Sequence, residues 1–299
     1  MTALHGWLLL DKPVGLGSTQ AVAAVKRAMR DGGYPKVKMG HGGTLDPLAS
    51  GVLPVALGEA TKLAGRLLDG DKVYAFTVGF GQETDTLDAA GKVVATSDVR
   101  PTAAQVGAVL PGFTGAIEQI PPAYSALKVD GARAYDLARA GAEVTLATRR
   151  VTVHALHILP ARGEDRAEIT LLAHVSKGTY IRSLARDIAH ALGTVGHVTY
   201  LHRLKAGPFS LDQAISLDIL REAAKARILE HHLLPLGAGL DDIPALALTP
   251  DQAGALRQGR VLVGIDAADG QTLATLHAVP QALVEVSAGQ VRVLRGFNL

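Results

Sequence analysis

Residues 40–55 read GHGGTLDPLASGVLPV and place one carboxylate, Asp46, in a loop of glycine, proline and apolar residues. Pro47 disfavours the helical conformation at the residue before it, so Asp46 is expected in an extended loop. The glycines on the N-terminal side permit backbone angles that other residues resist. The loop is therefore expected to be stiff and to aim the Asp46 side chain. Two interpretations stay open: a carboxylate held for chemistry, or a surface turn in which the aspartate bonds its own backbone.

Strands and helices are predicted on both sides of this loop. On the N-terminal side, a buried strand at Trp7–Leu10 is followed by a helix that Ser18 caps and that ends near Met29. On the C-terminal side, the hydrophobic periodicity predicts, in chain order, a strand at 53–57, a helix at 60–68, a strand at 72–80, a helix at 101–110, strands at 151–159 and 168–175, and a helix at 179–192.

The composition limits the class of protein. A length of 299 residues is typical of about two domains, and 48% hydrophobic residues allow a sizeable core. The absence of cysteine excludes disulfides, thiolate catalysis and cysteine-ligated zinc. No apolar run approaches the roughly 20 residues that span a bilayer, and the N-terminus lacks the pattern of a signal peptide. We therefore expect a cytoplasmic protein that does not enter a membrane.

The character of the chain changes near Leu240, which predicts two domains. Residues 1–240 would form the main domain, and residues 241–299 a small β-rich domain with one capped helix at 250–258. Within the main domain, residues 121–141 begin with two prolines and look like a long excursion with a helix near 134–140.

Basic residues cluster twice although the formal net charge is only +2. One interpretation is a local footprint for a polyanion, and the other is a pair of solvated helix faces. The first cluster contains Lys26, Arg27, Arg30, Lys36 and Lys38, and the second contains Lys177, Arg182, Arg186, Arg203 and Lys205.

Arg182 falls in the first turn of the helix predicted at 179–192, where the positive end of the helix dipole disfavours a cation. A carboxylate partner would relieve this conflict, because the planar guanidinium can hold both carboxylate oxygens. Asp46 is the candidate partner, and the pairing would keep it ionised and available as a nucleophile. The alternatives are that Arg182 binds phosphate or points to water.

Other candidate residues have two interpretations each. Tyr74 shares a strand face with apolar neighbours and is either a core or a pocket tyrosine. Tyr180 either stacks on a base or packs under the helix. His154 and His157 lie three apart on a strand, point to opposite faces and so form a poor metal-binding pair. The sequence contains no dinucleotide, Walker, HExxH or GxSxG motif.

Five segments together make the chain similar, nearly end to end, to a known family. They are 6–15 GWLLLDKPVG, 43–54 GTLDPLASGVLP, 121–128 PPAYSALK, 176–184 SKGTYIRSL and 207–209 GPF. On these segments the chain resembles the TruB family, the tRNA pseudouridine(55) synthases of bacteria. The family often has threonine after the histidine of the Asp46 loop, where this chain has Gly42.

The resemblance implies an α/β (α+β) fold, with a bent, mixed and largely antiparallel sheet around a central cleft. It also implies an RNA-gripping insertion at about 121–150 and a PUA-like domain at 241–299. By position, Asp46 would be the catalytic aspartate, Arg182 its ion-pair partner and Tyr74 the residue that stacks on the uracil. The remaining implied contacts with substrate are His41 in the space left by the flipped nucleotide, Tyr180 and Leu201 as pocket walls, and Lys12 and Lys128 on the RNA.

The implied reaction is the isomerisation of uridine to pseudouridine at position 55, in the T-loop of tRNA, after the base is flipped. It requires no cofactor or metal, and the T-arm would be the partner of a monomer with no obligate protein partner. Two other classes stay open. A retaining glycosidase would need a second carboxylate about 5 Å from Asp46, for which Glu59, Asp85 and Asp88 qualify only by residue type. A non-catalytic RNA-binding protein would use the same basic clusters.

Overall fold

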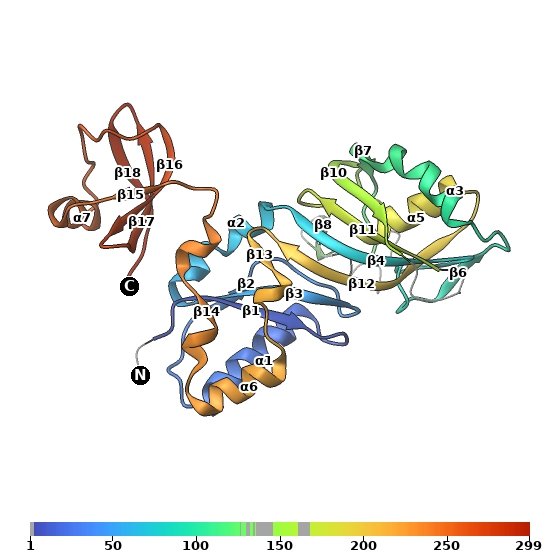
Figure 1. Ribbon diagram of the computed structural model, residues 1–299, viewed down its shortest axis with the longest axis horizontal. Coiled ribbons are helices and arrows are strands. Elements are labelled where there is room, and N and C mark those ends of the chain that lie inside the picture. Colours follow the sequence, from blue (N-terminus) through green and yellow to red (C-terminus); the bar gives the residue numbers. More distant parts are fainter. Residues whose placement is uncertain (1–2, 126, 130–131, 134, 136–145, 161–167) are drawn as a thin grey trace.

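A large mixed sheet dominates the computed structural model, which describes residues 3–125, 127–129, 132–133, 135, 146–160 and 168–299 (Figure 1). Strands from all parts of the main domain meet in it. Across the sheet they are β14 (Leu233–Leu234), β1 (Gly6–Lys12), β3 (Ala49–Leu57), β12 (Gly196–Ala206), β4 (Lys72–Phe80), β11 (Glu168–Val175), β10 (Arg149–Ile158) and β7 (Gly115–Gln119), with β2 (Met39–His41) on β3 and β13 (Phe209–Ser210) on β12.

The sheet is mixed and largely antiparallel, as expected. Within the described residues its strand pairs are antiparallel except β3 and β12, which run parallel where Leu201–Arg203 faces Ala49–Gly51. Strand β12 carries two bulges against β4, and bulges bend a strand and increase its twist. The central strand β12 therefore joins two halves of the sheet that carry separate hydrophobic cores.

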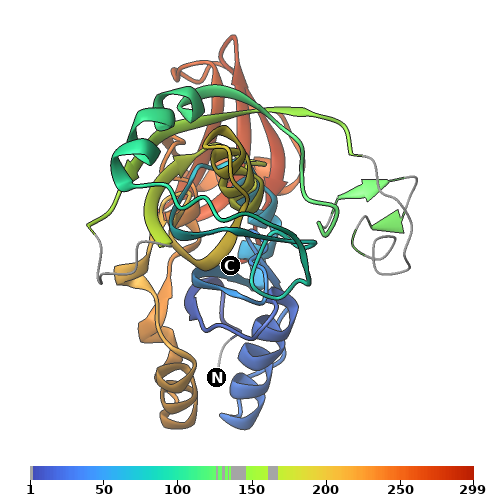
Figure 2. The ribbon, with the colours of Figure 1, turned by 90° about the vertical axis from the view of Figure 1, so that its right-hand side faces the viewer.

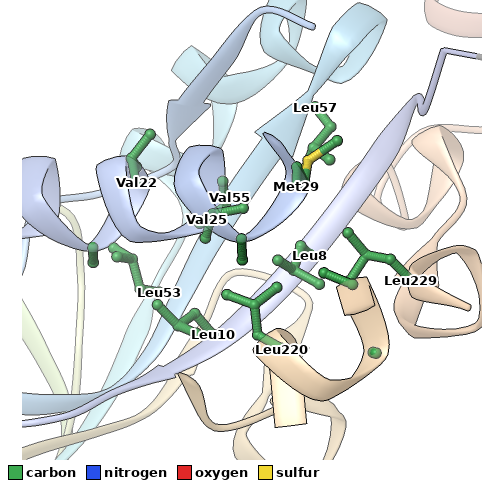
Figure 3. Close-up of a cluster of buried hydrophobic side chains, with 14 of the residues drawn as sticks. Leu8, Leu10, Val22, Val25, Met29, Leu53, Val55, Leu57, Leu220 and Leu229 are labelled. Carbon is green, nitrogen blue, oxygen red and sulfur yellow. The ribbon is translucent and has the colours of Figure 1, made fainter. Parts of the chain in front are cut away.

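Two pairs of helices cover the two halves. Helices α1 (Ser18–Asp31) and α6 (Leu217–Ala226) pack on β1 and β3, and lie side by side at the lower end of Figure 2. Helices α3 (Ala103–Val109) and α5 (Ile181–Ala191) pack on the strands of the other half. Apolar residues at helical spacing form these faces. Figure 3 shows Val22, Val25 and Met29 of α1 with Leu8, Leu10, Leu53, Val55 and Leu220.

The reverse side of β1 and β3 is buried as well. Trp7 has no exposed surface, donates a hydrogen bond to the Leu236 carbonyl at 3.0 Å and contacts the ring of Phe209. Burial on both faces explains why β1 is continuously apolar rather than alternating. The same core includes η1 (Gly58–Lys62), α2 (Ala64–Asp69) and η5 (Leu236–Gly239).

Residues beyond 244 form a second sheet with its own core, the red-brown part of Figure 1. Its strands are β15 (Ala245–Ala247), β16 (Gly270–Leu276), β17 (Val279–Ser287) and β18 (Gln290–Gly296), with helix α7 (Pro250–Arg257) against them. Leu273, Leu283 and Phe297 of this part also pack into the core around Trp7. The division of the chain at residue 240 stays a prediction.

Smaller elements complete the described part of the chain. They are the hairpins β5 (Gln82–Thr84) with β6 (Val93–Thr96) and β8 (Lys128–Val129) with β9 (Ala132–Arg133), and the 3-10 helices η2 (Leu110–Phe113), η3 (Leu211–Gln213) and η4 (Leu229–His232). The hairpin β8–β9 projects from the side of the molecule in Figure 2. No helix in the described part of the chain is long and apolar enough to cross a bilayer.

The predicted strands at 72–80 and 168–175 are confirmed to the residue. The helix predicted at 60–68 is wrong, because η1 and α2 divide this segment at Leu63. The prediction that Ser18 caps α1 is also wrong, since Gly17 occupies the cap and the Ser18 hydroxyl bonds the Leu45 backbone instead. The helix predicted at 134–140 lies outside the described residues, apart from Tyr135.

Gly51 lies in the parallel pairing of β3 with β12, directly opposite Arg203. Its φ angle is +99°, and a Cβ atom there would lie 2.2 Å from the carbonyl oxygen of Arg203. Only glycine combines this angle with this separation at low cost. The parallel contact that brings the Asp46 loop beside β12 therefore depends on Gly51.

We expect Gly51→Ala to lower the free energy of unfolding by at least about 2 kcal/mol, because backbone strain and overpacking add. Urea denaturation followed by circular dichroism measures the loss. Gly40→Ala is the matched control, since Gly40 lies at the start of the same loop and an added Cβ would meet no atom within 4 Å. Equal denaturation midpoints for the two variants would contradict the role of Gly51.

Candidate active site

A cleft of about 880 Å³ opens where the two halves of the sheet meet. Its walls come from the loop 43–49 before β3, the start of β4, the centre of β12 and the first residues of α5. The turn at 85–92 and residues 124–125 close another side. Segments distant in sequence therefore contribute side chains to one concave site, which is typical of a ligand-binding or catalytic site.

Asp46 lies in this cleft, in the loop that the sequence predicted to be stiff. Its carboxylate Oδ2 is 3.0 Å from Nη2 of Arg182, and 39% of its side chain is exposed. The structure thus brings together the two residues that the position of Arg182 in its helix suggested as partners. The exposed fraction leaves the carboxylate accessible from the cleft.

Arg182 is fixed by several partners at once. Its side chain is 6% exposed, and its Nη1 and Nη2 atoms donate to the carbonyl oxygens of Thr86 at 2.8 Å and Tyr124 at 3.0 Å. Its Nη1 also lies 3.5 Å from Oδ2 of Asp88. Burying a cation is costly unless it is paired and hydrogen-bonded. These contacts meet that requirement and hold the guanidinium between two carboxylates.

The turn that carries Asp88 is itself held in an uncommon conformation. Leu87 has a φ angle of +60°, in the left-handed region that costs a non-glycine residue about 1–3 kcal/mol. Oδ1 of Asp88 accepts hydrogen bonds from the Thr86 hydroxyl at 2.7 Å and the Ala90 amide at 3.0 Å. In the sequence, Asp88 was a candidate for a second carboxylate near Asp46 only because of its residue type. No sequence pattern indicated that it pairs with Arg182.

A second buried arginine holds the Asp46 loop. Arg203 is 1% exposed and donates from Nε to the Val52 carbonyl at 2.8 Å. Its Nη1 and Nη2 donate to the carbonyls of Thr44 at 3.3 Å and Gly43 at 3.2 Å. The loop backbone is therefore tied to the centre of β12 on both sides of Asp46.

The hydroxyl of Ser18 secures the residue beside Asp46. It accepts a hydrogen bond from the Leu45 amide at 2.7 Å and donates to the Leu45 carbonyl at 3.0 Å. Gly42 packs closely on α2, because a Cβ there would lie 2.4 Å from the Leu67 side chain. A larger residue at this position would therefore require the Leu67 side chain to move.

The second basic cluster is not a continuous surface footprint, because two of its members are buried. Arg182 and Arg203 are 5% and 1% exposed and use their charge inside the protein. Lys177 and Lys205 are exposed. The first cluster, by contrast, is exposed at all five of its basic residues. The interpretation as a polyanion footprint therefore stays possible only for the exposed members.

The three predicted wall residues line the cleft. Tyr74 on β4 lies directly across from Arg203 on β12, and Leu201 follows the bend of the same strand. Tyr180 caps α5, and its backbone exchanges two hydrogen bonds with the Gln119 side chain, at 2.8 and 3.1 Å. These three residues contribute two aromatic rings and one apolar side chain to the wall of the cleft that holds Asp46.

Two predicted RNA contacts lie away from the cleft lining. Lys12 has no exposed surface, and its Nζ donates to the carbonyls of Pro13 at 3.0 Å and Leu16 at 2.6 Å. The structure thus turns the Lys12 ammonium inward. His41 is half-buried on β2, and its Nδ1 has no hydrogen-bond partner among the described residues. The side chain of Lys128 lies outside the described residues.

Burial changes the titration of two groups near the cleft. Burial, aided by the nearby Arg203 charge, lowers the pKa of His41, so that its ring is neutral near pH 7. Burial also lowers the pKa of Lys72 to about 8. The Lys72 ammonium donates to the carbonyls of Leu67, Leu68 and Gly70, which fixes the end of α2 to the start of β4.

Two family models match consecutive parts of the chain. Residues 31–181 match the TruB family pseudouridylate synthase (N terminal domain), and residues 182–241 match the tRNA pseudouridylate synthase B C-terminal domain. The first match contains Asp46 and Tyr74, and the second begins at Arg182.

Curated relatives match over nearly the full length. The chain is 65% identical to a tRNA pseudouridine synthase B from Novosphingobium aromaticivorans, over 99% of this chain and 98% of the relative. A protein of the same name from Zymomonas mobilis is 63% identical, over 99% and 97%. The same name is given to a relative from Rhodospirillum rubrum that is 47% identical, over 99% and 97%.

Solved structures share the fold. A Cbf5-Nop10-Gar1 complex contains a chain with a TM-score of 0.73 and 26% identity, covering 98% of this chain and 85% of that one. An H/ACA RNP bound to a substrate RNA containing 2'-deoxyuridine gives a TM-score of 0.72 at 24% identity, covering 99% and 86%. With both domain models matched and 65% identity to a curated relative, the chain belongs to the TruB family of pseudouridine synthases.

Proposed function

We propose that this pseudouridine synthase isomerises the uridine at position 55 in the T-loop of tRNA, with Asp46 as the catalytic carboxylate. The observation that supports this most is the ion pair between Asp46 and the buried Arg182, inside the cleft of a chain 65% identical to a tRNA pseudouridine synthase B. Relatives with that name support tRNA as the substrate.

The reaction breaks the N1–C1′ glycosidic bond and joins C5 of the same uracil to C1′. No atom is gained or lost overall, so the isomerisation itself requires no redox or group-carrying cofactor. A single carboxylate can act as nucleophile at C1′ or at C6, or can assist proton removal at C2′. Each of these routes needs a carboxylate that is positioned in advance, which the contacts of Arg182 and Arg203 provide.

A uridine in a stacked RNA loop must leave the stack to reach Asp46, at a cost of a few kcal/mol. The aromatic and apolar walls formed by Tyr74, Tyr180 and Leu201 can repay part of this cost by contact with the flipped base. We assign stacking on the uracil and removal of the C5 proton to Tyr74. We propose that the His41 side chain fills the space that the flipped nucleotide leaves in the RNA.

The wider RNA contacts are proposals of the same kind. The segment 121–150, which includes the projecting hairpin β8–β9, would grip the T-arm. Arg149 lies over the ring of Tyr180, 5.8 Å from its centre, and links this segment to the cleft. The second sheet, within residues 241–299, would serve as a PUA-like RNA-binding domain. We expect a cytoplasmic monomer that needs no protein partner.

Lys12 has an indirect role in this proposal. Burial lowers its pKa to about 8, although the nearby Asp46 carboxylate opposes this shift. Near neutral pH Lys12 is therefore charged, and its charge is favourable for Asp46. Because its ammonium is held by the Pro13 and Leu16 carbonyls, it would also fix the turn that follows β1.

The proposal predicts tritium release from tRNA that carries 5-tritiated uridine, and no release from a tRNA with cytidine at position 55. Asp46→Asn should abolish the release while tRNA affinity stays within about tenfold, because the amide keeps the size but loses the reactive carboxylate. Release and filter-binding assays measure the two quantities separately.

Asp85→Asn is the matched control, because it removes a negative charge from the same cleft. The Asp85 carboxylate accepts a hydrogen bond from the Lys92 amide and is not a partner of Arg182. This variant should retain tritium release within about threefold of the wild type. That is a small change in the barrier, because a tenfold change in rate corresponds to about 1.4 kcal/mol. Normal release by Asp46→Asn would overturn the catalytic role. Loss of tRNA binding by that variant would assign Asp46 a structural role instead.

Arg182→Leu should reduce turnover at least about a hundredfold, or about 2.7 kcal/mol in the barrier, because Asp46 and Asp88 lose the cation that positions them. Single-turnover tritium release measures this effect on folded protein. Arg186→Leu, one turn further along α5 and paired with Asp187, is the control and should remain active. Near-normal turnover of Arg182→Leu would refute the importance of the pair.

The Lys12 pKa predicts a pH-dependent stability. Between about pH 8 and the ordinary value of 10.5, the unfolded chain retains a proton on Lys12 that the folded protein has released. Stability therefore rises with pH in this window. The free energy of unfolding of the wild type minus that of Lys12→Met should increase by up to about 3 kcal/mol between pH 7.5 and pH 10. Urea denaturation at both pH values tests this, and a constant difference would contradict it.

A further inference from the structure

Three side chains with metal-binding atoms converge on the surface of the sheet, outside the cleft. Nε2 of His154 is 3.2 Å from Oδ2 of Asp71, and Nε2 of His174 is 3.6 Å from the same oxygen. One potential ligand atom from each residue lies within 4.8 Å of the other two. All three side chains are substantially exposed, between 37% and 47%.

The fold creates this cluster through an irregularity that the sequence does not reveal. The pairing of β10 with β11 shifts between Val153 and Ala155, so that His154 is the extra residue of a bulge. The bulge places His154 beside His174, which lies opposite Ala155 on β11. The two imidazole rings are 4.7 Å apart. The spacing of His154 and His157 along one strand argued against a metal-binding pair. The histidine that lies beside His154 is His174, on the adjacent strand.

We propose that Asp71, His154 and His174 bind a divalent transition-metal ion of the Zn²⁺ class. Two imidazole nitrogens and one carboxylate oxygen are a common ligand set for zinc, with bonds of about 2.0–2.2 Å. Tetrahedral coordination at these bond lengths separates neighbouring ligand atoms by about 3.3 Å. The observed separations of 3.2 and 3.6 Å agree with this value, and solvent can fill the fourth position.

A simple ion pair explains the cluster less well. Two protonated rings at this separation would repel each other, and two neutral rings would both have to donate to the same carboxylate oxygen. A divalent cation accepts both neutral nitrogens and the carboxylate together. It therefore explains why both rings point at the same oxygen.

The site would brace the catalytic sheet from behind. Asp71 immediately precedes β4, on which Lys72 and Tyr74 line the cleft. Because side chains alternate along a strand, Asp71 belongs to the opposite face. Its carbonyl also accepts a hydrogen bond from the Gly207 amide at 2.8 Å. A bound ion would join β10, β11 and the start of β4 without touching the substrate, so the expected effect is on stability rather than on chemistry.

The test is a titration of the metal-free full-length protein with Zn²⁺ in a calorimeter, with thermal denaturation in parallel. The variants His154→Gln and His174→Gln each remove one ligand from an exposed position. His157→Gln is the matched control, since it lies on the same strand and forms no part of the cluster. The denaturation midpoint without metal verifies that each variant is folded.

Wild-type protein and His157→Gln should bind one equivalent of Zn²⁺ and melt at a higher temperature when it is bound. Each cluster variant should bind at least about tenfold more weakly and lose the metal-dependent increase. Isomerisation activity without metal should be unchanged in both cluster variants. Absence of a one-equivalent site in the wild type, or an equal loss of affinity in His157→Gln, would overturn the proposal.

Discussion

The buried guanidinium of Arg182 is the interaction on which the geometry of the cleft depends. It joins three segments that are far apart in sequence: the Asp46 loop, the turn that carries Asp88, and the start of α5. A buried cation is tolerated only with several partners, so the fold must bring these segments together around it. The helix dipole at this end of α5 disfavours a cation, which makes the carboxylates and carbonyls still more necessary. The requirement to satisfy one charge thus shapes the site.

Arg203 performs a different task with the same side-chain chemistry. It bonds three carbonyl groups, those of Gly43, Thr44 and Val52, and fixes the backbone rather than a carboxylate. It acts from β12, the strand whose bulges join the two halves of the sheet. The Asp46 loop is therefore positioned by the centre of the fold, and the Asp46 carboxylate by α5. The backbone of the loop and the side chain of Asp46 are thus held by two different arginines.

Sequence reasoning succeeded where a single segment contained the signal. Strand β4 alternates, and the position of Arg182 in its helix suggested a carboxylate partner, which the structure shows. It failed where the partner of a side chain was a backbone group or lay on a strand distant in sequence. From the sequence, Arg203 was interpreted as a surface charge, because the carbonyl groups that it bonds are distant in the chain. The nearest of them, that of Val52, lies 151 residues away. The left-handed Leu87 and the bulge at His154 depend on tertiary contacts, and no local pattern predicts either. The predicted helix at 60–68 is divided at Leu63, where η1 ends and α2 begins, although Ala60, Leu63 and Leu67 share one buried face as a single helix would predict.

The asymmetry of the ion pair fits the catalytic role that we propose for Asp46. Arg182 is almost fully buried, whereas the Asp46 side chain is 39% exposed toward the cleft. In the described part of the chain, Oδ2 of Asp46 has Arg182 as its partner, while Oδ1 has no hydrogen-bond partner and so remains available to a substrate. A group oriented in advance needs little reorganisation when the reaction begins, and this lowers the barrier. In the proposed reaction, the conformational cost would then fall mainly on the RNA, whose uridine would leave its stack to meet a carboxylate that is already in position.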